Sequence, residues 1–144
     1  MRTIALRFSD SFAPSSGTIE EHRKMISEAG FVWYGKLGAT VSDKVCKDIL
    51  ANDSPRILLI HSGKTSRYWA YVDQITRVTP PISGIPEYYR NQTSKFKTWF
   101  RLVRIDEADK SVMSACTVVS SRTPLSMASR HSMSPYFIVD YIDG

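Results

Sequence analysis

Long hydrophobic runs are missing from this sequence of 144 residues. No window approaches the roughly 20 consecutive apolar residues that a membrane-spanning helix needs. The first residues include Arg2 and Arg7, but no apolar stretch of the kind found in a signal peptide. We therefore expect a soluble, cytoplasmic protein.

Cysteine and histidine are also scarce, with two cysteines and three histidines in the chain. Cys46 and Cys116 are far apart in sequence, and no cysteine–histidine cluster has the spacing of a zinc site. His22 has no candidate ligand beside it, so we expect it on the surface or edge of a helix. The sequence predicts reduced thiols, no metal site and no cofactor.

Catalytic motifs are absent as well. Gly35-Lys36-Leu37-Gly38 and Gly63-Lys64-Thr65 both lack the glycine spacing of a phosphate-binding loop. His61 and Ser62 are neighbours at the end of an expected strand, where consecutive side chains point to opposite faces. We therefore expect a protein that is not an enzyme.

Hydrophobic periodicity predicts strands through most of the chain and two early helices. The first helix begins at Thr18, which has the spacing of a capping box with Glu21, and it ends at Gly30. Ser42-Asp43 is expected to cap the second helix. Strands are expected at residues 3–8, 31–34, 56–61, 67–76, 95–104, 116–119 and 136–141, and residues 120–134 form a loop or short helix. This order suits one α+β domain over residues 1–144, with a curved sheet or small barrel and flanking helices.

Residues 30–38 combine aromatic side chains with glycines. Phe31 to Tyr34 form an apolar strand, and Gly35 and Gly38 are expected to break it, with Lys36 between them. Aromatic rings beside glycine backbone would let a flat molecule approach closely. The same residues would serve equally well as an ordinary core strand.

Lysine and arginine recur within a few positions of aromatic residues throughout the chain. Aromatic faces stack on unpaired bases with about 1–3 kcal/mol each, and cations neutralise phosphates. The net charge of +5 permits a polyanionic partner without requiring one. Core packing is the alternative for each ring, and simple solvation is the alternative for each cation. The candidate phosphate-binding residues are Lys36, Lys64, Arg67, Arg90, Lys97 and Arg101.

The order of these motifs resembles the PUA-like superfamily that includes EVE and YTH domains. The resemblance is carried by residues 18–22 leading to 30–36, the strands at 56–61 and 68–75, residues 85–89, and Trp99 to Leu102, and it spans about residues 18–140. It is strongest to the amino-terminal recognition domain of McrBC-type modification-dependent restriction GTPases. The fold implied is α+β, a small, strongly bent β-barrel with flanking helices.

The resemblance also implies an aromatic cage that holds a modified base, flipped or unpaired. The implied walls are Trp33, Tyr34, Trp69, Tyr71 and Trp99, with the 62–66 loop and residues 122–134 at the mouth. The implied function is recognition of a methylated base in DNA for a restriction system. The sequence carries no nucleotide-hydrolysing domain, so we expect either part of a larger protein or a stand-alone reader, with a GTPase or nuclease as partner.

Three alternatives stay open at this point. The chain would be an RNA-binding PUA-like module, a protein–protein adaptor with an exposed aromatic surface, or a small-molecule enzyme acting through His61 or Lys36. An adaptor would show little salt dependence towards oligonucleotides, whereas an enzyme needs a titratable group inside a pocket.

Overall fold

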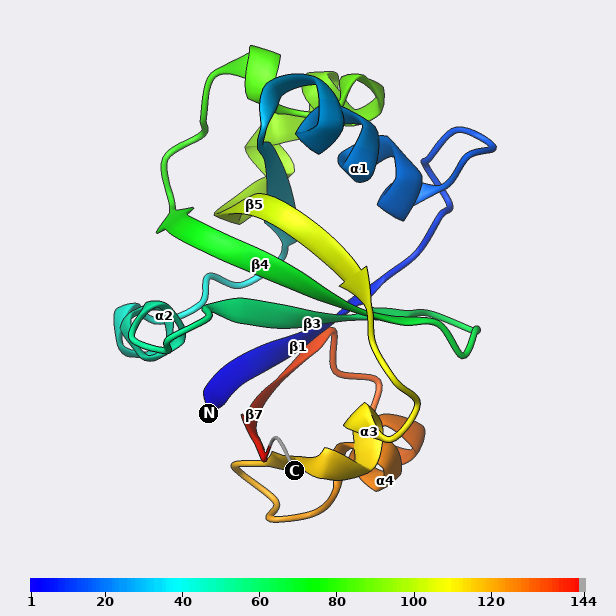
Figure 1. The fold of residues 1–144 in the computed structure, drawn as a ribbon, viewed down its shortest axis with the longest axis vertical. Helices are drawn as coiled ribbons and strands as arrows, with labels where there is room; N and C mark the ends of the chain where they lie inside the picture. The colour runs from blue at the N-terminus through cyan, green and yellow to red at the C-terminus, as the bar shows by residue number, and fades with distance from the viewer. Residues whose placement is uncertain (143–144) are drawn as a thin grey trace.

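The computed structural model describes residues 1–142, so residues 143–144, the end of the expected domain, lie outside the described part (Figure 1). One seven-stranded sheet has the strand order β2-β5-β4-β3-β1-β7-β6. Its strands are β1 (Arg2–Phe8), β2 (Val32–Leu37), β3 (Arg56–His61), β4 (Arg67–Thr76), β5 (Phe96–Glu107), β6 (Cys116–Val118) and β7 (Tyr136–Tyr141). The expected strands at these positions are confirmed, and β1 and β3 form the only parallel pair among residues 1–142.

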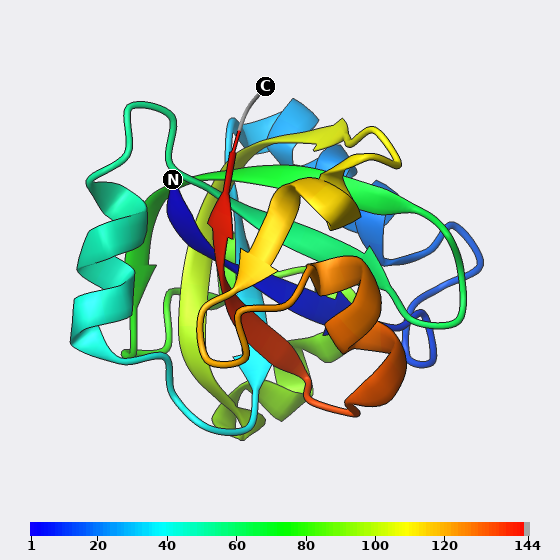
Figure 2. The same cartoon turned by 90° about the horizontal axis from the view of Figure 1, so that it is seen from below.

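The small, strongly bent β-barrel that the resemblance implied is not closed, because the two edge strands, β2 and β6, are not paired with each other anywhere in residues 1–142. Helices cover the two ends of the sheet instead. The helices are α1 (Thr18–Ala29), α2 (Asp43–Leu50), α3 (Val112–Ala115) and α4 (Leu125–His131), with 3₁₀ turns η1 (Ile82–Gly84) and η2 (Glu87–Lys95). Helix α1 packs on β2 and β5, whereas α3 and α4 pack on β6 at the other end (Figures 1 and 2). The mixed α and β architecture is as expected from the sequence.

Strand β3 lies in the middle of the sheet and separates two hydrophobic clusters. Ile57 and Leu59 belong to the cluster that includes α1 and α2 residues, whereas Leu58 and Ile60 belong to the cluster beside α3 and α4. Successive strand residues point to opposite faces, so this four-residue apolar run serves both clusters at once.

The amino-terminal cap of α1 differs from the expected capping box. Gly17 is the N-cap residue, and the Thr18 amide donates to Asp10 Oδ1 at 2.9 Å. Glu21 accepts a hydrogen bond from Ser16 Oγ at 2.8 Å instead of returning to the cap. The loop before the helix folds back, so a carboxylate eight residues away replaces the local cap. The expected end at Gly30 is confirmed, with φ of 88°, as is the Ser42 cap of α2, which accepts from the Val45 amide at 3.3 Å.

Gly35 does not break β2, contrary to expectation. It pairs with Trp99 inside the sheet, and the strand runs on to Leu37. A Cβ atom at Gly35 would come within 2.7 Å of the Phe96 ring. The glycine therefore permits close packing of a neighbouring ring, and the left-handed backbone that follows the strand lies at Gly38, with φ of 79°.

Candidate functional site

A cavity of about 390 Å³ lies where the end of β1, strand β2, the start of α1 and η2 meet. Ligand sites in proteins typically enclose about 300–1,000 Å³, so this first cavity has room for one nucleobase. Its lining contains six aromatic rings besides His22: Phe8, Phe12, Tyr34, Tyr88, Tyr89 and Phe96. Its cations are Arg7, Lys36 and Lys95, and no carboxylate of the described chain lines it.

Tyr34 and Lys36 face the first cavity from the same side of β2, because they are two residues apart in a strand. The Tyr34 hydroxyl forms no hydrogen bond with any residue of the described chain. Burial raises the pKa of Tyr34 above its ordinary value, so its hydroxyl stays neutral. Tyr34 therefore offers the cavity an unused hydroxyl group that can donate or accept.

The Lys36 side chain is only 5% exposed. Its Nζ atom donates to the Ala39 carbonyl at 2.7 Å and to the Leu37 carbonyl at 3.1 Å, and no carboxylate among residues 1–142 pairs with it. Burial lowers the pKa of Lys36. An ammonium group carries three N–H donors, so one donor remains, and the charge has the Tyr136 ring 4.4 Å away but no carboxylate partner within residues 1–142.

His22 lines the cavity and is 1% exposed. The expected position of His22 on the surface or edge of a helix is therefore wrong. Its Nδ1 lies 2.8 Å from the Thr18 carbonyl oxygen and donates to it, and its Nε2 lies 3.1 Å from the Tyr89 hydroxyl. That hydroxyl also lies 3.0 Å from the Trp33 carbonyl oxygen, so its single proton serves one of these two acceptors at a time. Burial lowers the pKa of His22 to about 4, so the ring is neutral at pH 7. The network fixes Tyr89 in the cavity wall.

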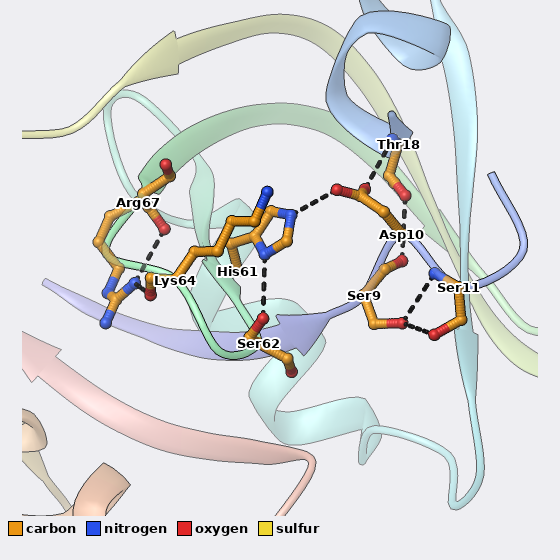
Figure 3. A network of polar contacts seen from close by, with 9 residues as sticks. Ser9, Asp10, Ser11, Thr18, His61, Ser62, Lys64 and Arg67 are labelled. Carbon is orange, nitrogen blue, oxygen red and sulfur yellow. Dashed lines mark hydrogen bonds and ion pairs between the residues drawn. The ribbon is translucent and has the colours of Figure 1, made fainter. Parts of the chain in front are cut away.

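The loop of residues 9–17, which forms another wall, is fastened by Asp10 (Figure 3). Asp10 Oδ2 lies 2.5 Å from His61 Nε2, while its Oδ1 accepts from the Thr18 amide. Burial alone would raise the pKa of Asp10, but the hydrogen bonds from Thr18 and His61 lower it below its usual range. His61 Nδ1 faces the Ser62 carbonyl oxygen, not the Ser62 hydroxyl. The pair thus joins the loop to β3 and α1.

The five rings proposed from the sequence do not surround one cavity. Only Tyr34 lines the first cavity, while Trp33 and Trp99 pack with Ile85 and Tyr89 in the core next to it. Trp69 packs in the cluster beside α3 and α4. The expectation of one cage does not match this arrangement, because β4 holds Trp69 and β5 holds Trp99 in different hydrophobic clusters.

Arg56 occupies the space beside Trp69 and Tyr71. Its guanidinium carbon lies 4.8 Å from the Trp69 ring centroid and 5.8 Å from that of Tyr71. Arg104 lies 4.0 Å from the Tyr71 ring centroid. Cation–π contacts within the protein therefore use these two rings.

The candidate phosphate-binding residues are also dispersed. Of the six, only Lys36 lines the first cavity. Lys64 is exposed in the β3–β4 hairpin, and Arg67 beside it donates to the Lys64 and Ser66 carbonyls at 2.9 Å (Figure 3). Arg101 pairs with Asp73 at 2.6 Å. Arg90 donates to the Ile85 carbonyl, and Lys97 donates to the Ser94 carbonyl.

Sequence reasoning did not select most of the residues that form the cavity. The additions are Arg7, Phe12, Tyr88, Tyr89, Lys95 and Phe96. The sequence signal for this part of the cavity was the Tyr88-Tyr89 pair directly after a proline-rich turn. Both rings lie at the start of η2, where Tyr89 is buried and Tyr88 is half-buried. The two rings lie 4.8 Å apart between centroids in an edge-to-face arrangement.

Comparison with protein-family models matches residues 4–136 to the family described as Pua-like. Neither the curated proteins nor the solved structures yielded a match to this chain. Within residues 1–142, every helix is too short or too polar to cross a membrane. The family suggests nucleic-acid binding in general. Because the match extends over most of the sequence, the chain belongs to the Pua-like family.

Proposed function

We propose that this chain is a nucleic-acid-binding module that takes one modified base, unpaired or extruded, into the first cavity. The proposal rests on one observation above all: a cavity of nucleobase size is lined by aromatic rings and cations, with no carboxylate from the described chain. Aromatic walls suit the faces of a base, and cations suit the phosphates that accompany it. In this proposal the chain binds its ligand and performs no catalytic step.

The rings of the first cavity supply the stacking energy. Extruding a base costs a few kcal/mol, and stacking on an aromatic ring returns about 1–3 kcal/mol. Tyr88 is half-buried, and Phe12 is 72% exposed in the loop that lines the cavity. Both have surface left to cover a ligand. A methyl group on the base adds about 0.8 kcal/mol when it is buried, which favours a methylated base.

Several cations lie in or near the wall of the first cavity. Arg7, Lys36, Lys64, Arg67 and Lys95 form no ion pair with a carboxylate of the described chain. Six other cations do: Arg2, Arg23, Lys44, Arg77, Arg101 and Arg104. Cations without a carboxylate partner occur elsewhere in the described chain too, but those in the cavity wall lie where a polyanionic partner would meet them.

We further propose DNA as the nucleic acid and a modification-dependent restriction system as the setting, with a GTPase or nuclease as partner. This part follows from the resemblance of the motif order to McrBC-type recognition domains. RNA is the alternative ligand, and it is included in the test as a separate arm.

The test is fluorescence-polarisation binding to matched DNA and RNA oligonucleotides at two salt concentrations. The bases compared are unmodified, 5-methylcytosine, 5-hydroxymethylcytosine and N6-methyladenine. We expect one modification to raise affinity about tenfold, or about 1.4 kcal/mol. Uniform weak binding that disappears with salt would overturn the proposal.

Two tyrosine variants locate the site. Tyr88→Ala should abolish the gain from the modification and keep the salt-dependent binding, because Tyr88 lines the first cavity. Tyr71→Ala is the matched control, since Tyr71 is equally half-buried but packs against Arg56 and Arg104. Equal loss in both variants would contradict the assignment of this cavity.

A further inference from the structure

We infer that a second cavity, next to the first, binds the sugar–phosphate of the nucleotide adjacent to the recognised base. The inference rests on the proposed function of the first cavity. The second cavity has a volume of about 650 Å³ and lies between β6, the turn at residues 119–123, α4 and β7. The two cavities would then form one footprint along a single strand.

The two cavities share a wall. Lys36 lines the first cavity, and its Nζ lies 4.4 Å from the centroid of the Tyr136 ring, which lines the second. Pro135 lines the first cavity, whereas its neighbours Ser134 and Tyr136 line the second. The phosphates on either side of an extruded base stay covalently joined to the neighbouring nucleotides. A strand with one base in the first cavity can therefore place its next nucleotide along this wall.

Arg7 reinforces the wall from the side of the first cavity. Its guanidinium donates to the carbonyl oxygens of Ser132 at 2.9 Å and of Ser134 at 3.0 Å. No carboxylate among residues 1–142 pairs with Arg7. A fixed positive charge thus lies between the cavities, where a phosphate that links two nucleotides would pass.

Hydroxyl groups dominate the polar lining of the second cavity. They come from Ser120, Ser121, Thr123, Ser132, Ser134 and Tyr136. Two pairs are in contact, with Ser121 Oγ 2.7 Å from Thr123 Oγ1 and Ser132 Oγ 3.0 Å from Ser134 Oγ. Hydroxyl side chains are frequent donors to phosphate and sugar oxygens. His131 adds a further donor, and the described part of the chain contributes no carboxylate to this lining.

The turn that forms one wall of the second cavity is preformed. Arg122 holds a left-handed backbone, with φ of 60°, and its amide donates to the Val118 carbonyl at 2.8 Å. The Val118 amide donates in turn to the Thr123 carbonyl at 2.8 Å. A non-glycine residue with positive φ persists only where its surroundings impose it. The hydroxyls of Ser121 and Thr123 are therefore positioned before a ligand arrives.

The experiment compares a modified nucleoside monophosphate with a trinucleotide that carries the same modified base in its centre. Binding of both is measured by NMR titration of the full chain. We expect the trinucleotide to bind about tenfold more tightly. Ser121→Glu should remove this gain, because it places a negative charge in the second cavity, and it should leave the monophosphate affinity unchanged.

Ser27→Glu is the matched control, since Ser27 is an exposed serine in α1, at the opposite end of the molecule from α4 (Figure 1). It changes the net charge equally and should keep the trinucleotide gain. If the trinucleotide gains nothing over the monophosphate, or Ser121→Glu keeps the gain, the inference is overturned and the proposed function stands. If neither ligand binds the wild-type chain, both the proposed function and the inference are wrong.

Discussion

The Lys36 Nζ atom lies 4.4 Å from the centroid of the Tyr136 ring, and these two side chains divide the first cavity from the second. The contact joins β2, an edge strand of the sheet, to β7, which lies near the opposite edge. It places a buried cation without a carboxylate partner between two cavities.

Lys36→Met should separate binding from stability. Loss of the buried ammonium removes the charge offered to a ligand, so oligonucleotide affinity at low salt should fall about tenfold. The free energy of unfolding should stay the same or rise, because burial of the Lys36 charge opposes folding. Both are measured on one preparation, by fluorescence polarisation and urea unfolding. Lys97→Met is the control, because Lys97 is exposed and lies outside both cavities. An equal loss of affinity in Lys97→Met would contradict a role for Lys36 in binding the ligand.

Trp69→Ala should act on stability and not on base preference. Trp69 is buried in the cluster beside α3 and α4, so truncation should lower the free energy of unfolding by about 3–5 kcal/mol. The protein that remains folded should keep its preference for a modified base. Urea unfolding and binding at low temperature measure the two effects. If the variant is stable but loses its preference for the modified base, the prediction is wrong and Trp69 contacts the base.

Gly35→Ala should destabilise the strand that carries Tyr34 and Lys36. The added Cβ would lie within 2.7 Å of the Phe96 ring and 3.0 Å of the Trp99 ring. Overpacking of this kind typically costs about 1–3 kcal/mol, which thermal unfolding would detect. The exposed Thr40→Ala should change stability far less. An unchanged melting temperature for Gly35→Ala would mean that β5 can move away without cost.

Stability should fall between pH 7 and pH 5 because of His22. The pKa of His22 is lowered to about 4 in the folded chain, against the ordinary value of 6.5. Between these values the unfolded chain takes up a proton that the folded chain does not, so stability declines as pH falls. The expected loss by pH 5 is about 2 kcal/mol. Urea unfolding at both pH values measures it, and His22→Gln should show a much smaller decline. His131→Gln, at an exposed position, should behave as wild type.

Sequence patterns predicted most of the secondary structure, because the signals involved are local. Gly30 ends α1 and Ser42 caps α2 through contacts within a few residues. The apolar run in β3 predicted a central strand, which the sheet order confirms. The PUA-like part of the resemblance is supported by the family match. The sheet is not closed into the small barrel that the resemblance implied, since closure depends on how distant edge strands meet.

The tertiary structure alone decided which residues share a cavity. His22 is buried because Tyr89, 67 residues away in sequence, covers it. Lys36 is buried against Tyr136 from β7, and Asp10 caps α1 across a loop. The sequence contexts of Trp33, Trp69 and Trp99 are similar, because each lies in an apolar strand near cations. Only the pairing of the strands determines which side each ring faces. In the structure all three tryptophans lie in the core, whereas Tyr34 and Lys36 face the first cavity.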